Sequence, residues 1–379
     1  SYAQTDWYIY QQQCPLYNAP GLPISWNKNQ YKEGTNEYVA VRPELKKQIE
    51  ELYRKHPEEA RDSFGEDPFE VKNILKYWVF SEKPEFHVIP TDTINIHIDK
   101  DALLRSGIML PKTIRHLKGE DLKDAIPDKL YIPLTDIRML TKVDLLMLEM
   151  LANCNWERPL YLAISVGSVS KLKFDNYFVQ EGLAFRFTPF DYKKWGDVGE
   201  NRLYAVDVER LYDNVMNRYK YGGLDTPGLY LDETTLRTCW YHRRLFAQLA
   251  KELIAQGDNE RAKKVLAYAE QVIPGYNVPE THESGSYDIA TAYATLGEKT
   301  KAVTLAVHLI AEAEDYINWA FSLKGNRIEM VRNDCIYKFW QWNQYNELLK
   351  KIDGEKYKES NRQFEEKYAL FAPTMSYKN

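Results

Sequence analysis

From about Asp207 onward, the apolar residues of nearly every segment recur at the spacing of an α-helix. Segments such as LRTCWYHRRLFAQLAKELIAQ and ERAKKVLAYAEQVI place these residues on one stripe, which a helix buries against a neighbour. Short breaks with glycine or proline separate the segments, at Gly222-Gly223, Gly257, Pro274-Gly275, Gly297 and Gly325. Helices joined by short turns form antiparallel pairs, so residues 206–379 are expected to form an all-α domain.

This helical half contains an internal repeat at an offset of 40 residues. The matching positions are Ala250 with Ala290, Gly257 with Gly297 and Ala262 with Ala302. In the first copy, about 240–274, small residues flank a bulky one and a proline ends the helix, as in the second helix of a tetratricopeptide repeat. The residues with this spacing are Ala262, Leu266, Ala269 and Pro274. The second copy, about 284–322, lacks the terminating proline, so we expect one good and one degenerate tetratricopeptide-like repeat.

Residues 1–205 have a mixed pattern, which predicts an α/β or α+β domain. INIHI (94–98) alternates like a β-strand, and LAFRF (183–187) is a second candidate strand. Thr141 and Asp144 have the spacing of a capping box, which opens the apolar helix LLMLEMLA. Directly after this helix, NWERPLYLAIS leads into a segment that is apolar on both faces. We therefore expect a buried strand at 160–164.

Composition excludes one class of function and leaves another open. The net charge is −5 and the charges are interspersed, so no nucleic-acid partner is predicted. The 28 Tyr, 14 Phe and 9 Trp residues can serve as stacking platforms for sugars or peptides, although filling of cores and interfaces is favoured. The candidate binding face in the helical half comprises Trp240, Tyr241, Tyr268, Tyr287 and Tyr293. An exposed cluster of these rings would favour binding, and their burial would favour a scaffold.

The sequence lacks the common metal and cofactor motifs. Its four cysteines, Cys14, Cys154, Cys239 and Cys335, are far apart and have no zinc-ligand spacing, which leaves their disulfide state open. No glycine-rich nucleotide loop or serine-hydrolase motif is present, and no cofactor is predicted. The longest apolar runs are far shorter than the ~20 residues that span a bilayer. The opening Ser1-Tyr2-Ala3 leads us to expect a piece of a longer protein.

One short motif carries candidate chemistry. Asp99-Lys100-Asp101 has the D-x-D form with which nucleotide-sugar transferases hold a divalent cation. His97, on the preceding strand, is a weaker candidate for a metal ligand. We favour the alternative that Asp99 caps a short helix and that Asp101 complements its dipole.

Two further groups of charged residues are interpreted as structural. Arg243 and Arg244 fit a solvated helix face better than an anion site. Glu157 and Arg158 are expected to form pairs with neighbouring groups and no site of their own. No catalytic constellation is therefore predicted.

Six blocks of the chain, taken in order, resemble the soluble C-terminal region of a family of bacterial multi-spanning membrane proteins. The blocks are TDWYI (5–9), GLPIS (21–25), LTKVDLLMLEMLANCNWERPLYLAI (140–164), DNYFVQEGLAFRFTP (175–189), RLYDNVMNRYKYGGLD (210–225) and LYLDETTLR (229–237). Their most distinctive residues are Asp6, Trp7, Tyr8, Trp156, Arg158, Pro159, Asp232 and Glu233. The family is labelled a domain of unknown function and is similar to protein O-mannosyltransferases of the GT-C type.

The resemblance implies a role outside the catalytic centre. In such a protein a membrane domain of the same polypeptide would use a lipid-linked sugar, and this chain would lie on the periplasmic side of the inner membrane. We expect a non-catalytic accessory domain that positions a protein or glycan acceptor or another partner. The alternatives are an independent glycan-active enzyme that uses Asp99 and Asp101, and a purely structural scaffold.

Overall fold

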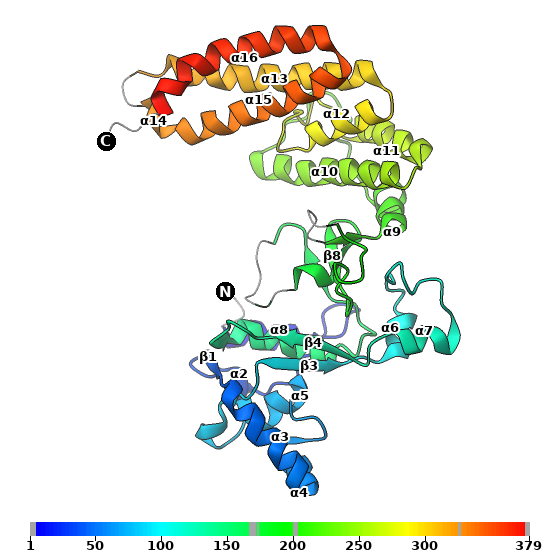
Figure 1. Ribbon diagram of the computed structural model, residues 1–379, viewed down its shortest axis with the longest axis vertical. Coiled ribbons are helices and arrows are strands. Elements are labelled where there is room, and N and C mark those ends of the chain that lie inside the picture. The colour runs from blue at the N-terminus through cyan, green and yellow to red at the C-terminus, as the bar shows by residue number, and fades with distance from the viewer. Residues whose placement is uncertain (1–4, 167–171, 173, 200–203, 325–326, 376–379) are drawn as a thin grey trace. The chain divides into compact units, whose positions relative to one another are not determined.

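The computed structural model describes residues 5–166, 172, 174–199, 204–324 and 327–375. The chain divides into two units (Figure 1). The first comprises Ser1–Gln180 and Ala184–Ala205, and the second comprises Glu181–Leu183 and Val206–Asn379. The first contains small sheets and helices, while the region 233–372 is all helical. The predicted fold class is thereby confirmed.

The helices of the first unit are short. They are α1 (Asp6–Gln13), α2 (Lys28–Tyr31), α3 (Lys46–Lys55), α4 (Pro57–Phe64), α5 (Val71–Ile74), α6 (Lys100–Arg105), α7 (Gly119–Ala125) and α8 (Lys142–Asn153). The longest are α3, with 10 residues, and α8, with 12. A π-helical turn, Leu75–Val79, continues α5. Its wider winding leaves Leu75, Trp78 and Val79 all buried.

Three small sheets accompany these helices. The strands are β1 (Tyr38–Val41), β2 (Val88–Ile89), β3 (Thr93–His97), β4 (Lys129–Pro133), β5 (Met139–Thr141), β6 (Tyr161–Ala163), β7 (Phe178–Gln180), β8 (Ala184–Phe187) and β9 (Ala205–Val206). Their orders are β2-β1-β5, β3-β4 and β6-β8-β7-β9. Strand β1 pairs with β2 in parallel, whereas β1–β5, β3–β4, β6–β8 and β7–β8 are antiparallel. The strands predicted at 94–98 and 183–187 are therefore present.

The prediction of a buried strand at 160–164 is wrong in one respect. Strand β6 forms there, but Tyr161 and Ala163 are exposed and Leu162 is only half-buried. The reason is its place in the sheet, because β6 lies at the edge and pairs with β8 alone among the described strands. An apolar run on both faces therefore does not distinguish a central strand from an edge strand.

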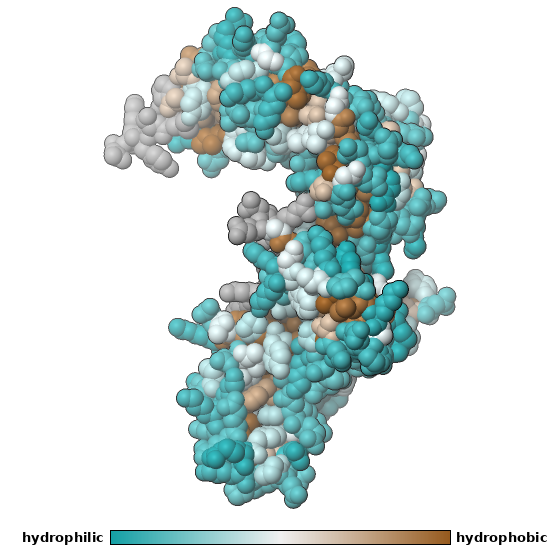
Figure 2. Space-filling model, turned by 45° about the vertical axis from the view of Figure 1, so that its right-hand side comes forward, coloured by the Kyte–Doolittle hydropathy of each residue, from teal (hydrophilic) through white to brown (hydrophobic). Residues whose placement is uncertain are grey.

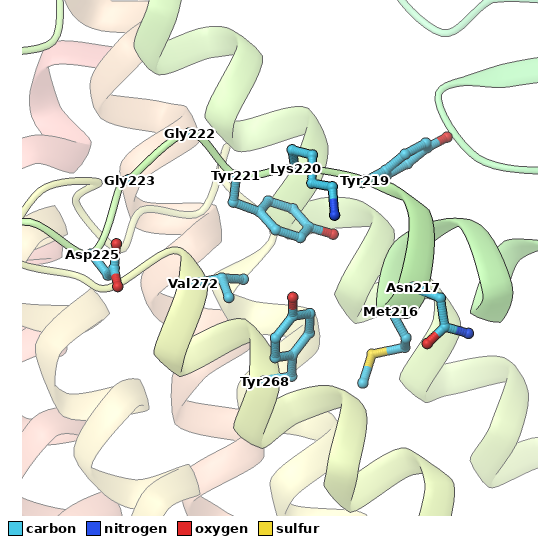
Figure 3. A pocket seen from close by; sticks show the side chains of 10 residues that line it. All are labelled: Met216, Asn217, Tyr219, Lys220, Tyr221, Gly222, Gly223, Asp225, Tyr268 and Val272. Atoms are coloured by element: carbon cyan, nitrogen blue, oxygen red, sulfur yellow. The ribbon is translucent and has the colours of Figure 1, made fainter.

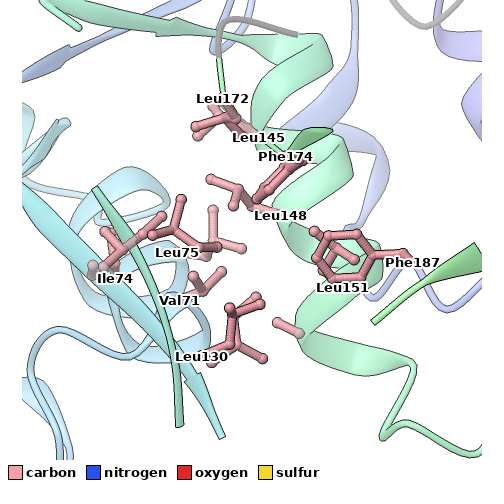
Figure 4. Close-up of a cluster of buried hydrophobic side chains, with 14 of the residues drawn as sticks. Val71, Ile74, Leu75, Leu130, Leu145, Leu148, Leu151, Leu172, Phe174 and Phe187 are labelled. Atoms are coloured by element: carbon pink, nitrogen blue, oxygen red, sulfur yellow. The ribbon is translucent and has the colours of Figure 1, made fainter. Parts of the chain in front are cut away.

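Helix α8 supplies the main apolar face of the first unit. The predicted capping box at its start is confirmed: the Asp144 amide donates to Thr141 Oγ1 at 3.3 Å, and the Thr141 amide donates to Asp144 Oδ2 at 2.9 Å. From this fixed start, leucines at helical spacing face the side chains of α5, its π-helical turn and β4 (Figure 4). The labelled side chains of this cluster are Val71, Ile74, Leu75, Leu130, Leu145, Leu148, Leu151, Leu172, Phe174 and Phe187.

The second unit consists of helices that pack side by side. They are α9 (Val208–Asp213), α10 (Glu233–Ala255), α11 (Asn259–Val272), α12 (Ser286–Thr295), α13 (Lys299–Ser322), α14 (Arg327–Met330), α15 (Arg332–Ile352) and α16 (Gly354–Met375). The main packed pairs are α10–α11, α12–α13, α10–α12, α13–α15 and α15–α16 (Figure 1). In the face that Figure 2 shows, hydrophobic residues form small patches within a mainly hydrophilic surface.

The two turns that lie 40 residues apart have the same hydrogen bonds. After α10, the Asp258 amide donates to the Leu253 carbonyl at 2.9 Å, and after α12 the Glu298 amide donates to the Tyr293 carbonyl at 2.9 Å. Gly257 and Gly297 both have φ of 81°, which is the left-handed conformation that ends a helix in a Schellman motif. The repeat found in the sequence therefore corresponds to a repeated helix–turn–helix geometry.

The predicted packing residues of the repeat lie inside the hairpins. Those that are buried are Ala250, Ala262, Leu266, Ala269, Pro274, Ala290 and Ala302. The second hairpin differs from the first in length, since α13 has 24 residues and α11 has 14. A proline ends the first at position 274, and the second has none there. That the hairpins are of the tetratricopeptide type stays a prediction.

Arg243 holds the loop between the two hairpins in place. Its guanidinium donates to the carbonyls of Ile273 at 2.9 Å, Val278 at 2.6 Å and Pro279 at 2.8 Å, and to Ser284 Oγ at 3.2 Å. The side chain is only 3% exposed, and burial lowers the pKa of Arg243 to about 10. The expectation that Arg243 lies on a solvated helix face is therefore wrong. Carbonyl acceptors far along the chain satisfy it, and these do not show in the local helical pattern.

Replacing Ala262 by leucine tests the packing of the first hairpin. Ala262 is fully buried between helices, so Ala262→Leu should lower the free energy of unfolding by roughly 1–3 kcal/mol because the added atoms overfill the contact. Chemical denaturation followed by circular dichroism measures the change. Ala267→Leu is the matched control, because Ala267 lies on the same helix and is exposed. Equal stability of the two variants would show that the assigned packing is wrong.

A second substitution tests the role of Arg243. Lysine retains the charge but cannot reach four acceptors with one planar group, so Arg243→Lys should destabilise the second unit by about 1–3 kcal/mol. Hydrogen exchange should also become faster in the amides of 274–285. Arg237→Lys serves as the control, since Arg237 forms an exposed pair with Glu233. Unchanged exchange in the loop would contradict the assigned role.

Candidate functional site

A polar pocket of about 250 Å³ lies in the first unit, where β3 ends. Three separate segments supply its charged groups. The lining residues are Asp67, Glu70, Lys72, His97, Asp99, Lys129, Ala152, Asn155 and Trp156. Because anionic and cationic side chains both line it, the pocket suits a ligand with several polar groups better than a simple ion.

The rim of this pocket is a turn with unusual backbone geometry. Asn155 and Trp156 have φ of 48° and 60°, and positive φ is uncommon for a bulky residue such as tryptophan. The turn is held because the Trp156 indole donates to the His97 carbonyl at 2.8 Å and its ring stacks on Phe187. Trp156 is buried, whereas Asn155 is exposed at the pocket. Such strain persists where the surroundings over-determine the conformation, and it often marks a functional position.

An ion pair fixes one wall of the pocket. Lys129 Nζ lies 2.6 Å from Asp67 Oδ2. Burial alone would raise the pKa of Asp67, but hydrogen bonds from Lys129, the Phe69 amide and Asn95 outweigh it and leave that pKa below its usual value. The same hydrogen bond raises the pKa of Lys129. Both groups therefore stay charged at neutral pH.

The structure separates the two carboxylates of the D-x-D motif. Asp99 caps α6, with its Oδ1 accepting from the Ala102 amide at 2.9 Å, so the favoured interpretation of Asp99 is confirmed. Asp101 instead pairs with Lys123 at 2.7 Å. Asp99 and His97 line the polar pocket, and Asp101 is not among its lining residues. Within the described part of the chain, no group of three or more His, Cys, Asp or Glu side chains could hold a metal ion.

The block around Trp156 has structural partners for its charged residues. Arg158 Nη1 donates to the carbonyls of Pro20, at 3.0 Å, and Gly21. Glu157 forms an exposed ion pair with Arg105 at 3.3 Å. This agrees with the prediction that these two residues pair with neighbouring groups.

The other family-block residues lie at helix starts. In α1, Asp6 accepts a hydrogen bond from the Trp7 amide, and the ring of Trp7 contacts Tyr8 edge to face. Asp232 caps α10 by accepting from the amides of Thr234 and Thr235. Glu233 pairs with Arg237 one turn later at 2.6 Å. These contacts give Asp6, Asp232 and Glu233 roles in starting helices.

A second pocket, of about 510 Å³, lies in the second unit (Figure 3). Its residues are Met216, Asn217, Tyr219, Lys220, Tyr221, Gly222, Gly223, Asp225, Tyr268 and Val272. The π-helical turn Asn214–Arg218 follows α9 and places the first of these residues, and Gly222 and Gly223 supply positive φ where the chain turns back. Burial raises the pKa of Tyr221 well above its usual value, and its hydroxyl donates to the Val215 carbonyl at 2.7 Å.

The predicted aromatic face is distributed over several places. Tyr268 lines the second pocket and contacts Tyr221, Tyr287 stacks on His282, and Tyr293 is buried and donates to Glu270. Tyr241 lies under the guanidinium of Arg244, and Trp240 is half-buried. No ring contact joins any two of these five described residues, so they do not make a single stacked surface.

Sequence reasoning missed the partners that complete each pocket. Asp67 and Lys72 come from one segment and Lys129 from another far along the chain, and nothing in a local pattern joins the two segments. Asn155 carries a usable signal, because asparagine directly after a helix end favours the left-handed conformation. The pair Gly222-Gly223 indicates a break between helices, but no sequence pattern shows that the tyrosines beside it line a pocket.

The fold and pockets define a two-unit protein, in which a mixed unit with a polar pocket precedes a set of helical hairpins. Residues 1–209 match the family described as TMEM260-associated domain 2. Because the match covers more than half of the 379 residues, the chain belongs to this family. The family indicates an accessory domain of a TMEM260-like membrane protein. No curated protein and no solved structure matches the chain.

Among the residues that the structure describes, no helix has both the length and the apolar character required to cross a bilayer. The polar pocket lies entirely within the residues that match the family, whereas most of the helical unit lies beyond the match.

The wall of the polar pocket predicts a pH dependence of stability. The pKa of Asp67 in the folded chain lies below its ordinary value of 3.8, so its stabilisation is complete above that pH and is lost as the pH falls through the folded pKa. Asp67→Asn should remove this component, and the loss of unfolding free energy between about pH 4 and about pH 2 should become shallower. Urea unfolding across this range measures it. Asp101→Asn is the control, because Asp101 lies in an exposed pair, and a larger effect of Asp101→Asn would contradict the assignment.

Proposed function

We propose that this chain is a non-catalytic accessory domain, on the periplasmic side of the membrane, that positions a protein acceptor for a membrane-embedded glycosyltransferase-like domain of the same polypeptide. The observation that carries the proposal is the family match, which associates residues 1–209 with a TMEM260-like membrane protein. The resemblance of the six sequence blocks to GT-C-associated proteins supports the glycosyltransferase part.

The polar pocket is the place where the acceptor would be held. Lys72 and Asn155 are exposed at it, and Glu70 and Asp99 add acceptor oxygens. A peptide segment offers carbonyl oxygens, amide hydrogens and side-chain hydroxyls, all of which such a mixed set of groups can bind. The strained turn at Asn155 and Trp156 would hold these groups in a fixed arrangement before the acceptor arrives.

The state of the carboxylates favours binding over catalysis. A glycan-active enzyme needs one carboxyl group with a raised pKa next to a second carboxylate. In the D-x-D motif, Asp99 is engaged in a helix cap and Asp101 in an ion pair, and the pair with Lys123 lowers the pKa of Asp101. An acid and a base are therefore not set up at this motif.

Substitution of the pocket's exposed polar groups tests the role in cells. The double variant Lys72→Ala with Asn155→Gly removes an ammonium and an amide, and glycine keeps the positive φ at 155 without strain. Glycopeptide mass spectrometry of envelope proteins should show about tenfold less glycosylation, which corresponds to the loss of one charge-assisted hydrogen bond. Lys47→Ala is the matched control, since Lys47 is exposed on α3 and outside the pocket.

Two results would overturn the proposal. In one, glycosylation is unchanged in the double variant, although the protein accumulates to the normal level. In the other, the purified chain alone transfers or hydrolyses a sugar. Immunoblotting of membrane fractions establishes the protein level in the first case.

A further inference from the structure

The second unit presents a cluster of aromatic rings that the proposed pocket does not use. It comprises His282, Tyr287, Tyr337, Trp340 and Tyr345, from the loop before α12, from α12 and from α15. His282 is the centre, with ring centroids at 5.5 Å from Trp340, 5.8 Å from Tyr287 and Tyr345, and 6.1 Å from Tyr337. We name this set the His282 cluster.

Two rings of the His282 cluster are open to solvent. Trp340 is 49% exposed and Tyr337 is 45% exposed. Their ring planes are 12° apart and their ring centroids are 5.6 Å apart. Ile336, the residue before Tyr337 in α15, is also exposed. Exposed, stacked aromatic residues on one helix face are characteristic of binding surfaces, where tryptophan and tyrosine contribute most of the affinity.

The other three members hold these two rings in place. Tyr345 is 1% exposed, and its hydroxyl lies 2.9 Å from His282 Nδ1. Tyr287 stacks on the imidazole from the other element, with its ring 16° from parallel. Burial lowers the pKa of His282, so the ring at the centre is neutral at neutral pH and places no positive charge under the surface. The exposed rings are therefore pre-ordered, which reduces the entropy lost on binding.

The charges that act on the cluster are mainly negative. The charged groups that act on its rings are Glu283, Asp288, Glu312, Glu347 and Lys338, and Arg244 lies beside Glu283, to whose carbonyl it donates. Lys338 pairs with Glu312 at 3.0 Å, and Lys350 lies 3.8 Å from Glu347. The Glu283 carboxylate accepts a hydrogen bond from Gln341 at 3.1 Å and has Arg244 beside it, so Asp288 is the carboxylate that remains in excess. An electron-rich aromatic face with an excess carboxylate attracts cations, and a guanidinium can both stack on indole and pair with a carboxylate.

We propose that the exposed face of the His282 cluster binds an arginine-bearing segment of a protein partner, with a guanidinium stacked on Trp340 and Tyr337 and paired with Asp288. This names the chemistry of a partner and so rests on the proposed accessory role. The site itself lies in the helical unit and shares no residue with the polar pocket.

Binding of a defined peptide to the purified chain tests the proposal. The probe is a short peptide of alternating arginine and glycine with both ends blocked, and tryptophan fluorescence or calorimetry measures its affinity. Trp340→Leu keeps apolar bulk but removes the indole face, and should weaken binding roughly 2- to 30-fold. Asp288→Asn should weaken it and reduce its dependence on salt. Trp7→Leu is the matched control, since Trp7 is 59% exposed in the other unit, and it should bind as the unsubstituted chain does.

The comparison peptide carries citrulline in place of arginine and has nearly the same shape without the charge. Much weaker binding of the citrulline peptide supports the proposal, and equal binding overturns it, because the face would then be merely apolar. Failure of every peptide to bind also overturns it. So does loss of self-association in Trp340→Leu, measured by sedimentation, because the face would then bind a second copy of this chain.

The two proposals can fail independently. Circular dichroism melting should show Trp340→Leu folded, because the ring that it removes is half exposed. Intact peptide binding together with unchanged glycosylation in the Lys72→Ala and Asn155→Gly double variant would reject the accessory role and leave this site in place. Lost peptide binding together with reduced glycosylation would reject the arginine-binding site and leave the accessory role in place.

Discussion

Burial of one helix face organises the first unit. Leu145, Leu148 and Leu151 of α8 are each at most 6% exposed, and each buried side chain of this kind contributes about 1.5–3 kcal/mol. They pack against α5 with its π-helical turn and against β4, two parts of the chain that lie far apart in the sequence. The capping box fixes where α8 starts, and the helix ends at Asn153. The strained turn at Asn155 and Trp156, and with it the rim of the polar pocket, follows directly from that end point.

The second unit depends on turns and on a single buried cation. Two Schellman turns set the direction of the hairpins, and small residues between the helices allow them to approach closely. Between the hairpins, Arg243 binds carbonyls of a loop that is too long for a plain helix connection. The helical unit thus combines a turn geometry that recurs in both hairpins with the Arg243 contacts, which do not belong to that repeat.

Features with local causes could be predicted from the sequence. The cap at Asp99, the capping box at Thr141 and the turns at Gly257 and Gly297 each depend on a few neighbouring residues, and all are present. Strand β6 shows where this fails, because its pattern indicated a strand but its exposure depends on which strands lie beside it. Arg243 shows the same for charge, since the acceptors that make its burial tolerable come from the loop 273–284.

The pockets and the His282 cluster were beyond sequence reasoning for a related reason. Tyr337 and Trp340 have the helical spacing of core residues, and only the packing of α15 shows that part of each ring faces water. Tyr287 was among the expected binding residues, but its neighbours His282 and Trp340 were not, since three different segments meet there.

The way in which Arg243 holds its loop has a consequence for how this region can vary. Three of its four acceptors are main-chain carbonyls, and every amino acid supplies one. The contacts of Arg243 therefore constrain the path of the loop backbone and one position on α10, but not the side chains of the residues whose carbonyls it binds. Two loop side chains are restricted by contacts of their own, because Val278 is buried and Asn277 donates to the carbonyls of Leu224 and Thr226. Related chains are free to diverge at exposed loop positions such as Pro279 while keeping the same arrangement of helices, provided that the arginine and the loop length are retained.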